Sequence, residues 1–315
     1  MNTLPDFNIV CLAGGVGGAK LAEGLAQIVP PENLSIIVNT GDDFTHLGLT
    51  ICPDLDTVLY TLGAVANPET GWGRQSETWQ VMDELAQLQG PDWFRLGDKD
   101  LALHLTRAHM LQEGNSLTAV TRHLCQTLNV SAEILPMSDH PAPTHIQTEA
   151  ERLSFQTWFV QKKWQPPVKQ VILPEMVHTS AQVAKRLEKA DVVLIAPSNP
   201  FVSIDPILNI YPVREMVMDL PQAVIAVSPI IGDSAVKGPA AKMMKELGMA
   251  ASATAVANYY GQLIDGFVYD TADANPLGRT DIAALRTNTL MKNGDSRRRV
   301  AEETLAFAQQ IIAGE

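Results

Sequence analysis

The sequence NIVCLAGGVGGAK at residues 8–20 places a run of apolar residues directly before a glycine-rich segment. The apolar run predicts a buried strand, and Leu21, Leu25 and Ile28 then recur at the spacing of a helix. A strand, a glycine turn and a helix in this order are typical of a unit of a doubly wound α/β sheet. The segment therefore indicates an α/β fold.

Three further apolar runs support the same fold class. They lie at residues 34–38, 191–196 and 223–227, and each is followed by polar or proline-containing residues. Continuous apolar strands are typical of a parallel sheet that is covered on both faces. Helical periodicity is found at residues 100–111, 117–128, 180–189, 240–247 and 297–312. Together these patterns predict a doubly wound, mostly parallel, Rossmann-like sheet.

The middle of the chain departs from this alternation. Helical patterns run from about residue 74 to 128, and β-favouring segments follow at 145–148 and 154–160 around a polar stretch. These two segments predict a β-hairpin. No Gly/Ser-rich linker divides the chain. We therefore expect a single α/β domain over residues 1–315, with a mostly helical insertion over about residues 70–165.

Composition and charge exclude several classes of protein. Hydrophobic residues make up 46% and charged residues 18% of the 315 residues, which is typical of a globular chain. The net charge of −12 disfavours general nucleic-acid binding, because phosphates need cations. Three widely spaced cysteines predict no disulfide framework, and no apolar run approaches the ~18 residues that span a membrane. We therefore expect a cytoplasmic protein that binds neither nucleic acid nor membrane.

The glycine-rich segment is the first candidate binding site. Gly15, Gly17 and Gly18 would let a phosphate group approach backbone N–H groups at the positive end of a helix. The segment is not a Walker A loop, because Ala19 separates the last glycine from Lys20. It is not a clean dinucleotide fingerprint either, because Lys20 takes the place of the third glycine. A tight turn without a ligand is the alternative.

Four aspartates form the second candidate site: Asp42, Asp43, Asp54 and Asp56. Mg²⁺ prefers a few carboxylates together with water and phosphate oxygens, so the cluster predicts a magnesium site near the glycine-rich segment. Each residue also has an alternative role. Asp56 could cap a helix, whereas Asp42 and Asp43 could form a solvated turn. An acid at the end of the second strand could also bind a ribose.

Polar residues after the apolar run at 191–196 form a third candidate site. Ser198, Asn199 and Ser203 lie where α/β sheets bind ligands, and they can hydrogen-bond a nucleobase or a phosphate. A proline-rich turn is the alternative. Arg95 directly follows two aromatic residues, a combination that suits stacking on a flat ring and binding of an anion. Core aromatics beside a surface arginine are the alternative for that segment.

Taken together and in order, these motifs resemble the CofD family of 2-phospho-L-lactate transferases, enzymes of deazaflavin coenzyme F-420 biosynthesis. The resemblance extends over nearly the whole chain. It rests on GGVGGAKL at 14–21, NTGDD at 39–43, CPDLDTV at 52–58, GWGR at 71–74, LGDKD at 96–100, LPMSD at 135–139, FQ at 155–156, PSNP at 197–200, SI at 203–204, PIL at 206–208, VSPI at 227–230 and KGP at 237–239. A single motif would mean little, whereas the ordered set is specific.

The resemblance implies a transfer reaction that depends on Mg²⁺. The acceptor is Fo, a deazariboflavin whose ribityl chain ends in a hydroxyl group. The donor is a guanosine diphosphate ester of lactate, or of a related acid such as enolpyruvate or glycerate. GMP is released when the phospholactyl or related group moves to Fo. The predicted insertion then forms part of the acceptor site.

The resemblance also implies roles for the candidate residues. Phosphate and nucleotide binding falls to Gly15, Gly17, Gly18, Lys20, Ser198, Asn199 and Ser203. Asp42 and Asp56 are the expected catalytic residues and Mg²⁺ ligands. Asp43 and Asp54 are the second choices for the metal. Asp56 and Arg95 are the expected contacts to Fo.

Two other functions are kept as alternatives. A nucleotide-sugar-binding regulatory paralogue without catalysis would share the glycine-rich segment and the paired aspartates, but the PDLD, GWG and PSNP motifs favour the transferase. An NAD(P)-dependent oxidoreductase would use Asp42 for a ribose, but Lys20 at the third-glycine position disfavours it. The acid of the donor is not specified by the sequence. We expect a homodimer, the commonest symmetric assembly.

Overall fold

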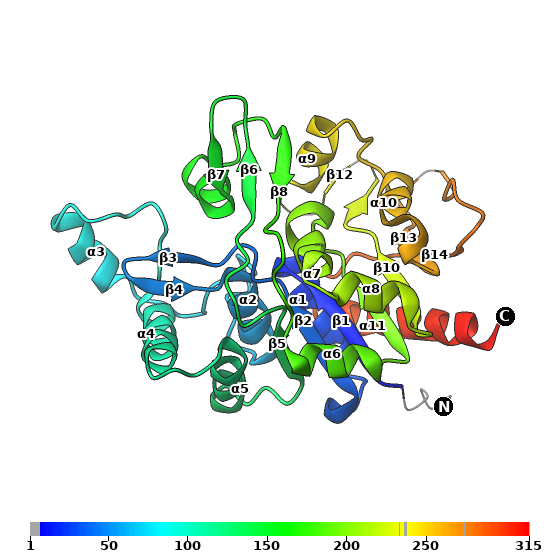
Figure 1. Ribbon diagram of the computed structural model, residues 1–315, viewed down its shortest axis with the longest axis horizontal. Helices are drawn as coiled ribbons and strands as arrows, with labels where there is room; N and C mark the ends of the chain where they lie inside the picture. Colours follow the sequence, from blue (N-terminus) through cyan, green and yellow to red (C-terminus); the bar gives the residue numbers. More distant parts are fainter. Residues whose placement is uncertain (1–6, 233, 236–237, 274, 315) are drawn as a thin grey trace.

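Seven parallel strands form the central sheet, in the order β14-β13-β10-β9-β1-β2-β5 (Figure 1). The structure is a computed structural model that describes residues 7–232, 234–235, 238–273 and 275–314, so Lys237 of the KGP motif lies outside the described residues. The strands are β1 (Ile9–Ala13), β2 (Leu34–Val38), β5 (Glu133–Pro136), β9 (Val192–Ile195), β10 (Ala223–Val227), β13 (Gly266–Asp270) and β14 (Ala283–Thr287). The predicted α/β class and doubly wound, mostly parallel, Rossmann-like sheet are confirmed.

Helices cover both faces of the sheet, which explains the continuous apolar strands. Ile9 and Cys11 of β1 pack on one face, and Val10 and Leu12 pack on the other. The first face is covered by α1 (Gly15–Ala26), α2 (Pro53–Leu62), α5 (Leu117–Thr127) and α11 (Gly294–Ala313). The second face is covered by α6 (Ala181–Glu188), α7 (Asp205–Asn209), α8 (Val213–Asp219), α9 (Ala240–Glu246) and α10 (Ala253–Tyr260). Every face of the inner strands is therefore removed from water.

The strand order reverses between β1 and β9. From β1 the chain proceeds outward to β2 and β5, and β9 then begins the other half of the sheet on the opposite side of β1. Both strands run in the same direction, so the segments that follow Ala13 and Ile195 leave the sheet at the same edge. Ligands of open α/β sheets bind at such a reversal. The topology therefore brings the first and third candidate sites together.

The predicted β-hairpin is confirmed in its first part and wrong in its second. Strand β6 (His145–Gln147) pairs with β7 (Arg152–Ser154), and β8 (Gln170–Ile172) adds a third antiparallel strand. The strand predicted to continue to residue 160 ends at Ser154, and a π-helical turn, η2 (Thr157–Gln161), follows. That turn buries Trp158, whose indole N–H donates to the Pro166 carbonyl oxygen at 2.9 Å. Burial of this side chain thus overrides the local β preference.

The range that we predicted as one insertion is divided in the structure. Strand β5 lies within residues 70–165, yet it is an edge strand of the central sheet. Before it, a hairpin of β3 (Phe44–His46) and β4 (Leu49–Ile51) packs with α3 (Gln80–Gln87) and α4 (Asp98–Gln112) around a small apolar cluster. Figure 1 shows this group at the opposite end of the molecule from the C-terminus. The β6–β8 sheet is the second piece.

The remaining elements are short. They are η1 (Pro31–Asn33), η3 (Pro200–Ile204), β11 (Ile230–Ile231), β12 (Ser234–Ala235) and η4 (Gly261–Leu263). Within the described ranges, no helix is long and apolar enough to cross a membrane.

Candidate active site

A cavity of about 800 Å³ opens at the edge of the sheet where the strand order reverses. The glycine-rich segment after β1 and the PSNP segment after β9 both line it. The hairpin and helix group contributes Trp93, Phe94 and Arg95, and the segment after β7 contributes Phe155 and Gln156. The volume lies in the range of small-molecule sites, about 300–1,000 Å³. The cavity is therefore a candidate site for a sizeable ligand.

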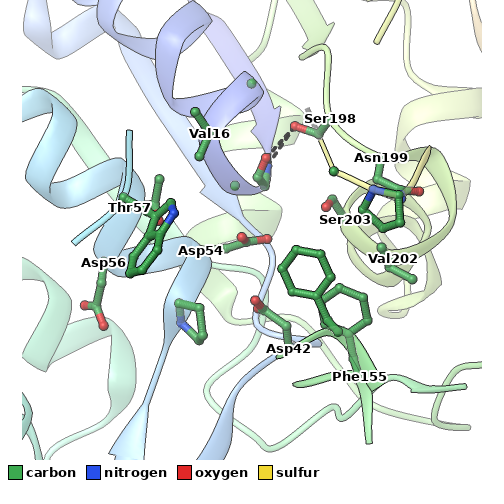
Figure 2. A pocket seen from close by; sticks show the side chains of 18 of the residues that line it. Val16, Asp42, Asp54, Asp56, Thr57, Phe155, Ser198, Asn199, Val202 and Ser203 are labelled. Carbon is green, nitrogen blue, oxygen red and sulfur yellow. Dashed lines mark hydrogen bonds between the residues drawn. The ribbon is translucent and has the colours of Figure 1, made fainter. Parts of the chain in front are cut away.

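Hydrogen bonds of Ser198 connect the segment after β9 to the glycine-rich segment. The Ser198 hydroxyl donates to the Gly14 carbonyl oxygen at 2.6 Å and accepts from the Gly14 N–H at 3.1 Å, as Figure 2 shows. Helix α1 begins at Gly15 with no side-chain hydrogen bond from its N-cap residue. Gly15 has a φ of +59°, in the region that favours glycine. The positive end of α1 thus faces the cavity, next to a residue, Gly14, whose N–H and carbonyl oxygen are both bonded to Ser198.

Gly17 leaves no space for a side chain. A Cβ atom at this position would lie 2.2 Å from the Pro197 carbonyl oxygen. We expect Gly17→Ala to force the two segments apart and to lower the free energy of unfolding by about 1–3 kcal/mol. Urea denaturation would measure the change. Gly294→Ala is the matched control, because its Cβ meets no atom closer than 3.9 Å. Equal stability of the two variants would contradict the close approach.

Asp42 and Asp54 face one another across the cavity floor (Figure 2). Burial raises the pKa of Asp42 well above its usual value, and the charges of Asp54 and Asp43 raise it further. Burial also raises the pKa of Asp54 to about 6. The groups that stabilise the negative charges are amides, since Gln156 donates to Asp42 at 3.0 Å and Asn39 donates to Asp54 at 2.9 Å. Two buried carboxylates that line the same cavity as the glycine-rich segment favour a bound cation.

Asp56 has a different environment from Asp54, although both lie in the first turns of α2. Both terminal nitrogens of the Arg107 guanidinium group, Nη1 and Nη2, donate to the Asp56 carboxylate, and the Arg107 side chain is only 2% exposed. Burial alone would lower the pKa of Arg107, but the charge of Asp56 raises it. The charge of Asp56 is therefore already balanced. The N-cap residue of α2 is Cys52, so the helix-cap alternative for Asp56 is wrong.

A buried chain of polar groups continues from this ion pair. Arg107 approaches Nδ1 of His104 at 3.1 Å. Because a guanidinium group can only donate, Nδ1 is the acceptor in this contact. Nε2 faces Asp100 at 3.4 Å, and the Tyr60 hydroxyl donates to the same carboxylate at 2.5 Å. Asp56, Tyr60, Asp100 and His104 line the cavity, and Arg107 lies behind them.

Arg95 lies at the cavity among aromatic side chains. Its guanidinium group lies over the Trp79 ring, 4.6 Å from the ring centre. Trp93 and Phe94 beside it contact one another edge to face, and Trp72 at the cavity is 51% exposed. A flat ring system and an anionic group could both bind on this side.

The other predicted residues lie at or close to the cavity. Lys20, Asn199 and Ser203 line it. Asn199 also builds its own turn, because its side-chain oxygen accepts from the Phe201 N–H at 3.0 Å. Gly18 lies beneath Ser198 rather than at the cavity surface, with the hydroxyl 2.8 Å from the position of a Cβ. Asp43 hydrogen-bonds with Cys52 behind the cavity.

Two residues in the centre of the site, Asn39 and Gln156, were not among the predicted functional residues. Asn39 is fully buried and directly follows β2, and Gln156 directly follows Phe155 after β7. Both amides donate to the aspartates described above. The buried position of Asp42 contradicts the alternative of a solvated turn. The signal in the sequence was the position of Asn39 at the end of an apolar strand, three residues before Asp42.

The donor set fits a metal ion that shares its ligands with a substrate. Among the described residues, no group of three or more His, Cys, Asp or Glu side chains is arranged to hold a metal ion by itself. Mg²⁺ keeps several non-protein ligands and often uses one or two carboxylates together with substrate phosphates. Asp42 and Asp54 supply such a pair beside the positive end of α1. The arrangement therefore suits Mg²⁺ with a phosphate-containing ligand.

Comparison with known proteins gives a consistent family. Residues 9–304 match the family model described as 2-phospho-L-lactate transferase CofD. A phosphoenolpyruvate transferase of Streptomyces griseus is 40% identical over 319 residues, which cover 98% of this chain and 100% of the relative. A 2-phospho-L-lactate transferase of Methanosarcina acetivorans is 38% identical over 301 residues, which cover 93% of this chain and 97% of the relative.

A solved structure shares the fold. It is the crystal structure of a member of the UPF0052 family from Bacillus halodurans, with a TM-score of 0.64 and 17% sequence identity. The match covers 95% of this chain and 99% of that chain. At this identity the similarity concerns the fold alone.

Proposed function

This chain belongs to the CofD family of 2-phospho-L-lactate transferases, and we propose that it acts on Fo in the biosynthesis of coenzyme F-420. The transferred group is phospholactyl or the related phosphoenolpyruvyl or phosphoglyceryl group. The donor is its guanosine diphosphate ester, and GMP is the second product. Relatives with two of these acids in their names are similar to this chain to nearly the same degree.

One observation carries this proposal: a single cavity joins three different chemical environments. The glycine-rich segment suits a diphosphate, the Asp42–Asp54 pair suits a cation, and the aromatic side with Arg95 suits a flat ring such as a deazaflavin. A transfer between a nucleotide donor and an aromatic acceptor requires all three within reach of one another. A protein that only binds a nucleotide would not need the aromatic side with Arg95.

The reaction joins the terminal ribityl oxygen of Fo to the phosphorus that carries the acid. The bond from that phosphorus to the GMP oxygen breaks, GMP keeps the bonding electrons, and the hydroxyl proton is released. Phosphoryl transfers of this kind depend on positioning and on charge stabilisation more than on a strong base. The backbone at the start of α1 would bind the diphosphate, and Arg95 with its aromatic neighbours would orient Fo.

Asp42 and Asp54 would hold Mg²⁺. When bound, the ion would supply positive charge against the charge that develops on the phosphate oxygens. We prefer Asp54 to Asp56 as the second ligand, because Arg107 already balances the charge of Asp56. Asp56 is then held rigidly in the wall of the cavity, on the side of the proposed acceptor.

The test is a transfer assay with purified protein. Fo is incubated with Mg²⁺ and, in parallel reactions, with the guanosine diphosphate ester of lactate, of enolpyruvate or of glycerate. We expect one donor to give a product of the mass of Fo plus the phosphoacyl group, with one GMP per product. EDTA should stop the reaction, and added Mg²⁺ should restore it. Binding of the donor without product from any of the three would contradict the proposal and favour a regulatory nucleotide-binding role.

A further inference from the structure

Asn39 is the hydrogen-bonding centre of the cavity floor. Its side-chain nitrogen lies 2.9 Å from an oxygen of Asp54, 3.2 Å from the Val202 carbonyl oxygen and 3.4 Å from an oxygen of Asp42. Its side-chain oxygen accepts from the Gly41 N–H at 2.7 Å. The residue is fully buried, so none of these contacts is shared with solvent.

These contacts join segments that are distant in the sequence. Asp42 lies in the turn after β2, Asp54 in the first turn of α2, and Val202 in η3 after β9. The backbone N–H of Asn39 also donates to the carbonyl oxygen of Ala13, directly before the glycine-rich segment. One side chain and its backbone therefore fix all four parts of the cavity floor relative to one another.

We propose that Asn39 is a positioning residue, which holds the Asp42 and Asp54 carboxylates in the orientation that binds the metal ion. This inference rests on the proposed function. Asn39 acts through the two aspartates and not by contact with the substrates. Groups that hydrogen-bond to metal-ligating side chains typically change metal affinity or activity by about 10–100-fold when they are replaced.

An amide is the side chain that this position requires. Its nitrogen can donate to two carboxylates while its oxygen accepts from a backbone N–H, and it adds no charge. An aspartate of the same shape would turn an oxygen toward Asp54 and Asp42 and add a third negative charge. An alanine would leave the Gly41 N–H and an oxygen of Asp54 without this partner.

Gln156 differs from Asn39 in a way that the experiment can use. Its side-chain nitrogen donates to Asp42 at 3.0 Å, and within the described ranges it makes no hydrogen bond to Asp54. If Asn39 positions both carboxylates, its loss should affect metal binding more than the loss of Gln156. Thr40→Val is the matched control, because the buried Thr40 hydroxyl has no hydrogen-bond partner in the described part of the chain.

The experiment compares Asn39→Ala, Asn39→Ser, Gln156→Ala and Thr40→Val with the unchanged protein. Calorimetric titration with Mg²⁺, without and with GDP, gives metal affinity, and the transfer assay at varied Mg²⁺ separates the metal requirement from kcat. For Asn39→Ala we expect the Mg²⁺ concentration at half-maximal rate and the Mg²⁺ Kd to rise about 10–100-fold. Excess Mg²⁺ should restore part of the rate. Gln156→Ala should raise these two Mg²⁺ values by a smaller factor, and Thr40→Val should change them by less than about twofold.

Two results would overturn the inference. One is an Asn39→Ala protein that folds and binds Mg²⁺ as Thr40→Val does. The other is unfolding of both Asn39 variants, which would make the residue structural. Failure of the proposed function is recognised separately, because unchanged protein and Thr40→Val would then bind Mg²⁺ but form no product. The Mg²⁺ titrations would still test Asn39 in that case, and absence of Mg²⁺ binding by the unchanged protein, both without and with GDP, would overturn both proposals.

Discussion

Changing Asp42 to asparagine is expected to lower the rate of the proposed transfer by about a thousandfold. A metal ion contributes several kcal/mol to the stabilisation of transferring phosphoryl groups, and 1.36 kcal/mol corresponds to a factor of ten in rate. The amide keeps the shape of the side chain but removes the negative charge that would hold Mg²⁺. Steady-state rates with the active donor at saturating Mg²⁺ would measure the loss.

The same substitution should not weaken the fold. Burial and the charges of Asp54 and Asp43 raise the pKa of Asp42, which means that the ionised carboxylate is less favourable in the folded protein than in the unfolded chain. Asparagine removes this cost at neutral pH, so the melting temperature should stay the same or rise. Loss of activity together with equal or higher stability is typical of residues that serve function.

Asp43→Asn provides the matched control for Asp42→Asn. Asp43 is the next residue in the chain, but it hydrogen-bonds with Cys52 and does not line the cavity. We expect its transfer rate to stay within about tenfold of the unchanged protein, which is a change of 1.36 kcal/mol or less in the barrier. Equal losses in both variants would show that the charge of the whole cluster matters, and that Asp42 has no special role. A normal rate for Asp42→Asn would remove the residue from the mechanism.

The sequence predicted the inner half of the sheet well, because each strand there is buried on both faces. Strands β2 and β10 have the predicted bounds, β1 begins one residue later than predicted, and β9 is one residue shorter at each end. Strands β13 and β14 were not predicted. The residues of β14 are exposed or half-buried and give no apolar run. Strand β13 is buried, but it begins with Gly266 and ends with Asp270, which leaves only three apolar residues between them. Strand β5 was not predicted as a strand, and its residues fell within the predicted insertion, because a four-residue strand after two helices carries no sign of which sheet it joins.

Most residues of the candidate site were predicted from the sequence, but the side chains that hydrogen-bond or pair with them were not. The motifs identified the glycine-rich segment, the aspartates and the PSNP segment, and the sheet topology explains why they converge on one cavity. The different environments of Asp54 and Asp56 could not be predicted. The difference depends on Arg107, which is 51 residues from Asp56 and has the sequence environment of an ordinary helix residue. Only the packing of α4 against the rest of the site buries it there.

Replacing Arg107 by alanine is expected to produce the largest loss of stability among the substitutions considered. Removal of one partner of a buried ion pair leaves the other charge without compensation and typically costs about 3–5 kcal/mol. Arg107 and Asp56 are 2% and 7% exposed, and His104 also loses a hydrogen-bond donor. Urea denaturation at neutral pH should show a decrease of this size in the free energy of unfolding. The control is Arg298→Ala, which removes the partner of Glu302 in an exposed ion pair on α11. It should change the free energy of unfolding by less than about 1 kcal/mol.

A double substitution separates the charge effect from the loss of packing. Asp56→Asn alone should also destabilise the fold, because it leaves the buried guanidinium group without its carboxylate. Arg107→Met combined with Asp56→Asn removes both charges and keeps much of the volume, so it should be more stable than Arg107→Ala by about 1–3 kcal/mol. If the double variant loses as much free energy of unfolding as Arg107→Met and Asp56→Asn lose separately, added together, the ion pair is not the source of the stability. If the double variant is stable but transfers slowly to Fo, with an increased KM for Fo at unchanged Mg²⁺ requirement, Asp56 belongs to the acceptor side of the cavity and not to the metal site.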